Sequence, residues 1–229
     1  MANIYGLAIQ DHINNPEETT KIEVHSPDFD TDYLDPKYLL RGHDEWPEIE
    51  LQAMEWAQGN ILDVGALAGI HSEYLIEQGK SVTALEIDKI ACEILAKKNI
   101  PYIHADIFGD NAVAQYDTLL LLMNGLGIGG NFDEFENHID LLFRWLKPGG
   151  SIIADSSDLD FLNYTDNEAT YYGELSFRLS YKEAVGNDFK WLYIDYESAK
   201  KKLETKQYKM EMLVLDQATN HYLARITRE

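Results

Sequence analysis

The feature that most constrains the fold is a regular alternation of short apolar runs with amphipathic segments between residues 46 and 158. Each apolar run has the length of one buried strand, and the segments between them repeat apolar residues at helical spacing. The expected strands span residues 60–64, 81–88, 100–108, 116–124 and 151–158. The expected helices span residues 49–58, 71–79, 89–98 and 132–146. Because strands that alternate with helices pair in parallel, the pattern predicts an α/β fold with a mostly parallel sheet.

The two ends of the chain follow different patterns. Residues 1–45 are polar and acidic with three prolines, and we interpret them as an N-terminal cap or lid with one or two short helices. Residues 46–229 are then one globular unit. Toward its end, residues 174–182 alternate like a strand and residues 195–205 fit a helix. Two further apolar runs flank the turn 217–220, which predicts a terminal antiparallel hairpin.

Composition narrows the classes of partner. The chain has 229 residues with 19 Lys+Arg against 40 Asp+Glu, a formal charge of −21. Such an acidic surface repels phosphates, so we expect no nucleic-acid partner and favour cationic or neutral small ligands. A single cysteine, Cys92, excludes an internal disulfide. Neither a membrane-length apolar run nor a signal peptide is read, so a cytoplasmic protein without a membrane partner is expected.

Chemistry-bearing residues follow four of the expected strands. In an open α/β sheet, ligands bind at the carboxyl ends of the strands. A glycine there lets the backbone turn sharply, and an acid there can accept from ribose hydroxyls or from an adenine amino group. The four strand ends carry Asp63-Val64-Gly65-Ala66-Leu67-Ala68-Gly69, Glu86, Ala105-Asp106-Ile107 and Met123-Asn124-Gly125-Leu126-Gly127.

Two other nucleotide-binding patterns fit less well. The dinucleotide fingerprint G-x-G-x-x-G needs a close first pair of glycines, whereas this loop has only Gly65 and Gly69. A nicotinamide cofactor is therefore the weaker alternative. A phosphate-binding loop is excluded because no Gly-Lys-Ser/Thr follows the strand.

In this order and spacing, the motifs resemble those of the class I S-adenosylmethionine-dependent methyltransferases. The resemblance covers roughly residues 45–155. It rests on Leu62-Asp63-Val64-Gly65 with Gly69 and His71-Ser72, on residues 82–88, on His104-Ala105-Asp106, on Tyr116-Asp117 and on Leu146-Lys147-Pro148-Gly149-Gly150. Residues 122–130, 155–158 and 171–174 also resemble a bacterial subgroup of the family. The resemblance implies a Rossmann-like seven-stranded sheet with a reversed last strand and helices on both faces.

The resemblance also implies S-adenosylmethionine as the cofactor, with S-adenosylhomocysteine as product, and a binding role for each matching position. Asp63, Gly65, Ala66, Leu67 and Gly69 would surround its methionine part, and Glu86 would bind the ribose. Ile87 and Ile107 would lie beside the adenine, and Asp106 would meet the adenine amino group. Asn124 and Gly125 would lie near the sulfonium and its methyl group.

Leu67 departs from the family pattern, which usually has a glycine at this position of the loop. If the loop needs a positive φ there, a leucine strains it by about 1–3 kcal/mol. The side chain could also reach the cofactor. This departure keeps open a second hypothesis, a methyltransferase-like module that binds the cofactor weakly or catalyses nothing.

Candidates for the acceptor side follow the fifth strand and the later aromatic segment. Asp158 could orient or deprotonate an acceptor, or it could cap a helix. Tyr171 and Tyr172 could line a substrate pocket or pack in the core, and Glu174 lies beside them in sequence. Asp158 and Tyr171 are the catalytic residues that we predict.

The N-terminal cap and the histidines add further candidates. Tyr38 and Arg41 are expected near the cofactor, where Arg41 could pair with a carboxylate as a planar fork; a surface ion pair is the alternative. Tyr33 and Trp46 could cover the cleft or belong to the core. The seven histidines show no ligand-spaced pair, so no metal is predicted.

The motifs therefore favour an enzyme that methylates an O, N or S atom of a small molecule. The fourth strand ends in Asn124-Gly125-Leu126-Gly127 and lacks the Asn/Asp-Pro-Pro-Tyr typical of methylation on nucleobases and glutamine. A protein substrate is a further alternative, because an acidic cleft suits Lys- or Arg-bearing peptides. The enzyme is expected to be a monomer or a homodimer.

Overall fold

A seven-stranded sheet forms the centre of the molecule. The computed structural model describes residues 3–110, 112–160 and 170–228, and its main sheet has the order β11-β12-β7-β6-β3-β4-β5. Its strands are β3 (Asn60–Val64), β4 (Ser81–Glu86), β5 (Tyr102–His104), β6 (Tyr116–Leu121), β7 (Leu146–Ser157), β11 (Tyr208–Asp216) and β12 (His221–Arg228). All neighbours pair in parallel except those of β12, which runs antiparallel to β7 and β11. The predicted α/β sheet with a reversed last strand is confirmed.

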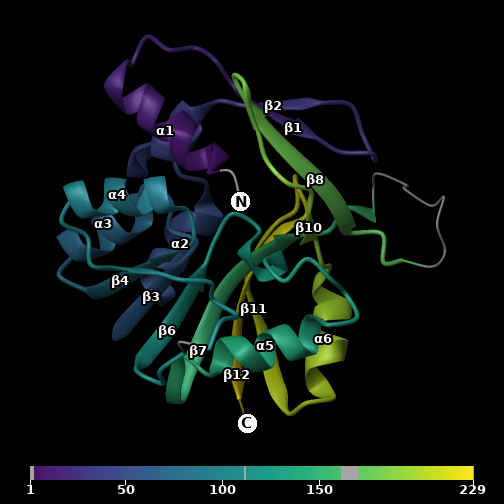
Figure 1. Cartoon of the computed structure of the whole chain (residues 1–229). Helices are drawn as coiled ribbons and strands as arrows, with labels where there is room; N and C mark the ends of the chain where they lie inside the picture. Colours follow the sequence, from purple (N-terminus) through teal and green to yellow (C-terminus); the bar gives the residue numbers. More distant parts are fainter. Residues whose placement is uncertain (1–2, 111, 161–169, 229) are drawn as a thin grey trace.

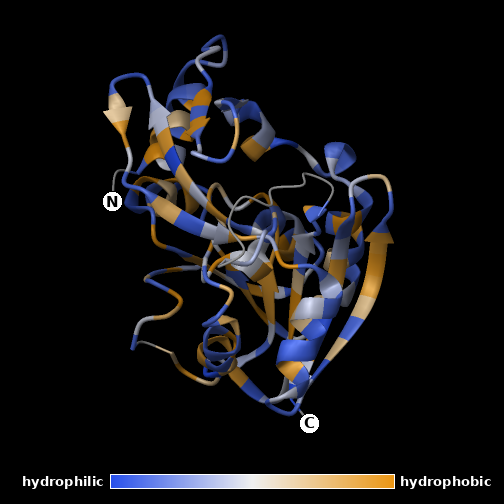
Figure 2. Ribbon diagram, turned by 90° about the vertical axis from the view of Figure 1, so that its right-hand side faces the viewer, coloured by the Kyte–Doolittle hydropathy of each residue, from blue (hydrophilic) through white to orange (hydrophobic). Residues whose placement is uncertain are grey.

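Helices cover both faces of this sheet, as expected. They are α2 (Glu48–Trp56), α3 (Ile70–Glu77), α4 (Lys89–Lys97), α5 (Phe135–Phe143) and α6 (Tyr196–Glu204). Ile61 packs with α2 and α3 in one apolar cluster, whereas the next residue, Leu62, packs with α5 and α6 in another. Alternate residues of a strand point to opposite faces, so the two clusters are the two sides of the sheet. Figure 2 shows the central strands as largely hydrophobic and the peripheral loops as largely hydrophilic.

A second, smaller sheet was not predicted. It has the order β10-β8-β1-β2, with β9 also paired to β8. Its strands are β1 (Ile22–His25), β2 (Asp32–Leu34), β8 (Glu174–Tyr181), β9 (Ala184–Val185) and β10 (Phe189–Leu192). The N-terminal segment therefore contributes two strands in addition to α1 (Ile4–Asn14) and the short 3-10 helices η1 (Pro36–Leu40) and η2 (His43–Glu45). The strand expected at 174–182 pairs with these N-terminal residues instead of extending the main sheet.

The second sheet and α1 lie over the carboxyl ends of the parallel strands. Figure 1 shows them together at one end of the molecule, with the C-terminus at the opposite end. Because β12 is antiparallel to β7, the C-terminus marks the amino end of the parallel strands. The backbone N–H of Gly6 in α1 donates to Asp88 Oδ2 at 2.9 Å, and Asp88 also caps α4. The N-terminal segment is thus attached at the edge where α/β proteins bind ligands.

The glycine-rich loop after β6 packs against the backbone of β10. A Cβ added to Gly127 would lie 1.7 Å from the carbonyl oxygen of Leu192, and one added to Gly130 would lie 2.6 Å from that of Lys190. These two glycines therefore allow the backbone of β10 to approach the loop after β6. The indole N–H of Trp191 then donates to the carbonyl oxygen of Asn124 at 2.9 Å.

The helices were compared with the requirements for a membrane-spanning segment. Within the three described stretches of the chain, none of them combines the length and the apolar character that crossing a bilayer requires.

The contact between Gly127 and β10 predicts a large effect of one added methyl group. Gly127→Ala should lower the free energy of unfolding by about 3 kcal/mol, because the obstacle is backbone and cannot rotate away. In a chain of this size the melting temperature should fall by roughly 6–12 °C. Thermal denaturation followed by circular dichroism measures it. The matched control is Gly42→Ala, whose Cβ would meet only the exposed end of the Asp44 side chain; an equal effect in both variants would contradict the packing argument.

Candidate active site

A small cavity of about 20 Å³ lies where β3 and β6 end. It is lined by Leu39, Asp63, Val64, Gly65, Ala66, Leu67, Ile70, His71, Leu122 and Met123. Four of the predicted cofactor residues are therefore brought together: Asp63, Gly65, Ala66 and Leu67. Leu39 comes from η1, so the N-terminal segment forms part of the wall.

The loop after β3 has glycine at two positions, 65 and 69, for different structural reasons. Gly65 has φ +71°, and a Cβ added to it would meet nothing within 4 Å. Gly69 has φ +76°, and its Cβ would collide with Leu95 and Ile100 of the core. Gly69 therefore allows helix and strand to pack closely, while Gly65 leaves open space at the cavity, into which a ligand can come close to the backbone.

Leu67 adopts the conformation that favours glycine. Its φ is +47°, so the condition under which a leucine strains this loop is met. Met123 and Asn124, directly after β6, also have positive φ values of +63° and +60°. Leu67 and Met123 pack against an apolar cluster formed with the N-terminal segment. We infer that this packing offsets the backbone strain, because it would be lost with a glycine at position 67.

Glu86 holds the loop after β3 against β4. Its carboxylate is 3% exposed and accepts three backbone N–H groups, from Leu67 at 2.8 Å, Ile87 at 2.8 Å and Asp88 at 2.7 Å. Burial raises the pKa of this carboxyl, and the backbone hydrogen bonds act in the opposite direction. A carboxylate has about four acceptor positions, so one remains for a ligand hydroxyl.

The residues expected beside an adenine separate into exposed and buried ones. Ile87 is 50% exposed, an uncovered apolar side chain at the sheet edge, whereas Ile107 is 4% exposed and packs in the core. Asp106 is exposed, and its Oδ1 accepts the N–H of Phe108 at 2.9 Å. Its second oxygen has no hydrogen-bond partner among the described residues.

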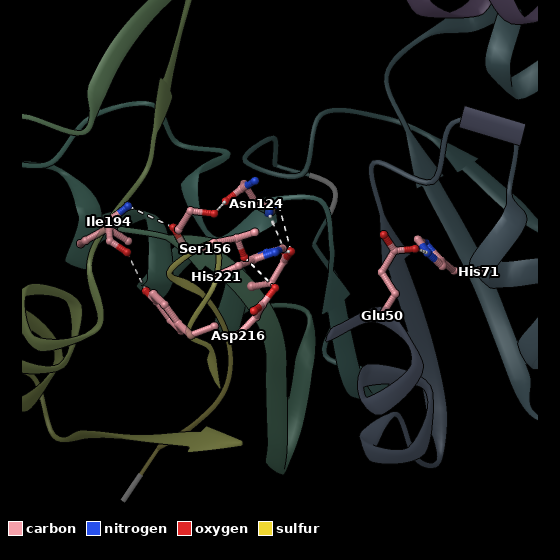
Figure 3. Close-up of polar contacts among 12 residues, drawn as sticks. Glu50, His71, Asn124, Ser156, Ile194, Asp216 and His221 are labelled. Carbon is pink, nitrogen blue, oxygen red and sulfur yellow. Dashed lines mark hydrogen bonds and ion pairs between the residues drawn. The ribbon is translucent and has the colours of Figure 1, made fainter. Parts of the chain in front are cut away.

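Arg41 belongs to a buried network. Its guanidinium pairs with Glu50, whose other oxygen lies 2.8 Å from His71 Nε2. Figure 3 shows the Glu50–His71 pair. Arg41 also donates to the carbonyl oxygen of Tyr38 at 2.7 Å and stacks on the Tyr38 ring. Arg41 is 4% exposed, so the ion pair that it makes is buried rather than on the surface. Its buried Nε has no hydrogen-bond partner among the described residues.

The other predicted residues of the N-terminal cap and the cavity include both exposed and buried side chains. Tyr33 and Tyr38 are 55% and 44% exposed, whereas Trp46 is buried against His71. Asp63 is buried and accepts the hydroxyl of Ser72 at 2.6 Å. Burial raises the pKa of the Asp63 carboxyl, and the nearby His71 lowers it.

The predicted acceptor-side residues meet through a fourth residue, Asp195. The Tyr171 hydroxyl donates to Asp195 Oδ2 at 2.6 Å, and the Tyr172 hydroxyl donates to Asp158 Oδ1 at 2.7 Å. Tyr171 also stacks on Phe132 with ring centroids 4.1 Å apart. Burial raises the pKa of both tyrosines, so their hydroxyls stay protonated. Glu174 donates its backbone N–H to the carbonyl oxygen of Tyr171 at 2.9 Å, and its carboxylate accepts the N–H of Phe132 at 3.1 Å.

Two functional candidates were missed in the sequence, Asp155 and His221. Asp155 is fully buried and accepts the backbone N–H groups of Asn124 at 3.1 Å and Gly125 at 3.2 Å. His221 Nε2 lies 2.6 Å from Asp155 Oδ2 (Figure 3). The pair is 66 residues apart in sequence, so no local motif marks it. The only available signal was that the first residue of the last strand falls at the ligand-binding edge.

The polar side chains at this edge of the sheet form two separate groups. Figure 3 shows the Glu50–His71 pair apart from the group around His221 and Asn124. In the part of the chain that the structure describes, no three His, Cys, Asp or Glu side chains gather as metal ligands.

The positive φ of Leu67 can be tested by stability alone. Leu67→Gly should be about 1 kcal/mol more stable than Leu67→Ala, because both lose the packing but only glycine adopts this φ without strain. Leu7 packs against the same cluster from α1, so Leu7→Gly should be less stable than Leu7→Ala by about 1 kcal/mol. Urea denaturation of the four variants gives both differences. The same sign at the two positions would mean that Leu67 is not strained.

Comparison with known proteins identifies the fold and the family. No protein-family model matches the sequence, and a search of curated proteins finds no match. Among solved structures, an S-adenosylmethionine-dependent methyltransferase from Bacteroides fragilis, in complex with S-adenosyl-L-homocysteine, has a TM-score of 0.91. The alignment covers 99% of this chain and 94% of that chain.

More distant structures share the fold alone. A methyltransferase of the same kind from Clostridium acetobutylicum is 15% identical with a TM-score of 0.58, covering 82% of this chain and 92% of that one. The sugar N-methyltransferase KedS8 from Streptoalloteichus is 16% identical with a TM-score of 0.57, covering 84% and 92%. With 34% identity to the Bacteroides fragilis enzyme over almost its whole length, the chain belongs to the S-adenosylmethionine-dependent methyltransferases.

Proposed function

We propose that the enzyme methylates an O, N or S atom of a small molecule. In this proposal the cofactor lies over the ends of β3, β4 and β5, and the acceptor lies over the ends of β6, β7 and β12. When bound, the cofactor supplies an activated methyl group on a sulfonium, a leaving group that needs no acid assistance. Alignment of the acceptor can then supply much of the rate.

The observation that carries the cofactor site is the open space at Gly65. It lies above a loop whose backbone is held in place by the buried carboxylate of Glu86, and it opens on a cavity between β3 and β6. The surrounding groups suit the parts of the cofactor. Arg41 Nε suits the carboxylate of its methionine part, Glu86 retains an acceptor position for ribose, and the exposed Ile87 suits an adenine ring.

The acceptor side rests on its own group of residues. Asp158 and Asp195 are held by Tyr172 and Tyr171, and this aromatic and acidic wall adjoins the loop at Asn124. It favours a small neutral or cationic acceptor, as does the charge of −21. Asp158 is expected to orient the acceptor. Tyr171 contributes a wall, because its hydroxyl is engaged by Asp195 and its ring by Phe132.

The cofactor proposal is tested by calorimetric titration with S-adenosylhomocysteine. Asp106→Asn should weaken binding about tenfold, because an amide would turn an N–H donor toward the adenine amino group; tenfold corresponds to about 1.4 kcal/mol. S-inosylhomocysteine carries a carbonyl in place of that amino group, so the same variant should bind this analogue more tightly than the wild type does.

The control is Asp110→Asn, an exposed neighbour of the same charge. It should leave both affinities unchanged, which separates the local contact from the loss of a negative charge. No binding of S-adenosylhomocysteine to the folded, ligand-free wild type would overturn the proposed function. Binding without turnover on any acceptor would instead favour the non-catalytic hypothesis.

A further inference from the structure

His221 lies at the carboxyl edge of the sheet because β12 is antiparallel. Its first residue pairs with Ser157, the last residue of β7, so His221 is held where the parallel strands end. The adjacent Asn220 accepts the N–H of Asp158 at 3.0 Å, which brings the predicted acceptor-side residue beside it. The strand thus places a histidine on the acceptor side of the proposed site.

A continuous set of contacts joins His221 to the cofactor cavity. Met123 lines that cavity, and the next residue, Asn124, donates its N–H to Asp155. Asp155 in turn contacts His221. The Asn124 side chain is also fixed, since its Oδ1 accepts the hydroxyl of Ser157 at 2.8 Å. A single buried carboxylate therefore determines the position of both the loop after β6 and the histidine.

The hydrogen bonds of Asp155 determine which nitrogen of His221 carries the proton. An ionised carboxylate only accepts, and Asp155 already receives two N–H groups from the backbone. His221 Nε2, at 2.6 Å from the same carboxylate, must then be the donor. In the neutral imidazole, Nδ1 is left with its lone pair, and no described residue hydrogen-bonds it. The His221 side chain is 20% exposed, so it is partly accessible to solvent.

We propose that His221, oriented by Asp155, is the catalytic base that removes the proton of the methyl acceptor. This inference rests on the proposed function, and it narrows the substrate class to acceptors whose nucleophilic atom carries a proton, such as a hydroxyl or an amine. The acceptor–CH₃ bond forms as the S–CH₃ bond breaks, and the bonding pair stays on sulfur, which becomes a neutral thioether. The proton of the acceptor passes to Nδ1.

The surroundings stabilise the protonated imidazole. Asp155 on β7 faces Nε2, and Asp216 on β11 is the cross-strand neighbour of His221. Asp158, beyond the end of β7, is the third carboxylate near this strand end. No Lys or Arg of the described residues pairs with these three carboxylates. Asp155 is fully buried, whereas Asp158 and Asp216 are partly buried. In the proposal these carboxylates offset the positive charge that the imidazole gains on proton transfer, and solvent removes the proton afterwards.

The tyrosines of the acceptor side do not compete for this role. Burial raises the pKa of Tyr171 and of Tyr172, and each donates its hydroxyl proton to a carboxylate. Neither oxygen can take a proton from an acceptor in that state. His221 is therefore the group on this side that has a free lone pair on a nitrogen.

The first test needs no acceptor. ¹⁵N NMR of histidine-labelled protein with S-adenosylhomocysteine should show neutral His221 protonated on Nε2, with Nδ1 unprotonated. Asp155→Asn should change the tautomer populations of this residue alone. A proton found on Nδ1 in the wild type would overturn the proposal, whether or not an acceptor is known.

The second test measures turnover with four probes: tyramine, benzylamine, 4-nitrophenol and thiophenol. For a protonated acceptor, His221→Asn should lower kcat about 100-fold with little change in KM and remove the acidic limb of the rate–pH profile. Thiophenol and 4-nitrophenol, both largely deprotonated at pH 8, should be methylated at nearly the wild-type rate. Equal loss with all probes that are turned over would make His221 structural. If no probe is methylated, the tautomer measurement decides alone.

A matched control is His25→Asn. His25 lies near Glu23 and hydrogen-bonds Ser180 within the second sheet, so it is another acid-paired histidine outside the site. It should leave turnover unchanged. Binding of S-adenosylhomocysteine, measured for the wild type and every variant, separates the two proposals. If the wild type does not bind it, the proposed function is refuted. If the wild type and His221→Asn both bind it and turn over the acceptor equally fast, only the role of His221 as catalytic base is refuted.

Discussion

The buried carboxylate of Asp155 connects the elements around the proposed acceptor site. It lies in β7 and accepts from the loop after β6 and from the first residue of β12, so three strands converge on one side chain. Removing an ionised carboxylate from water is costly unless donors surround it, and here three donors do. The second sheet joins the same point, since Trp191 donates to the carbonyl oxygen of Asn124. The position of this loop is therefore determined from both of its sides.

The opposite half of the edge is held by a different kind of contact. Glu86 fixes the loop after β3 through the N–H of Leu67, while the side chain of Leu67 packs into the cluster of the N-terminal segment. A family glycine could supply the backbone shape but not this packing. The leucine therefore couples the loop to the N-terminal segment, at the cost of some backbone strain from its positive φ. Loop and N-terminal segment should consequently move together when a ligand enters.

The parallel sheet and its terminal hairpin could be predicted because their signals are local. Each strand such as 60–64 is a short apolar run, and each connection has a helical period or a turn. The second sheet could not, because β1 lies in a polar segment without a strand pattern and pairs with β8, the strand expected at 174–182, about 155 residues later. The contact of Gly127 could not be predicted for the same reason, because its partner, the backbone of Leu192, is distant in sequence. Position-specific motifs marked the cofactor side, whereas Asp155 and His221 become a pair only in the folded sheet.

The asymmetry between the two halves follows from what each must do. A cofactor that is the same for a whole family can be recognised by short motifs at fixed strand ends, so Gly65 and Glu86 are visible in the sequence. An acceptor differs between members, and the acceptor site that we propose is built from residues on late and distant elements, here β7, β12 and the segment at Tyr171. An antiparallel last strand is suited to this task, because it begins at the ligand-binding edge. Its first residue, His221, lies at this edge without an intervening loop. Backbone hydrogen bonds between β12 and β7 hold His221 more rigidly than a loop would.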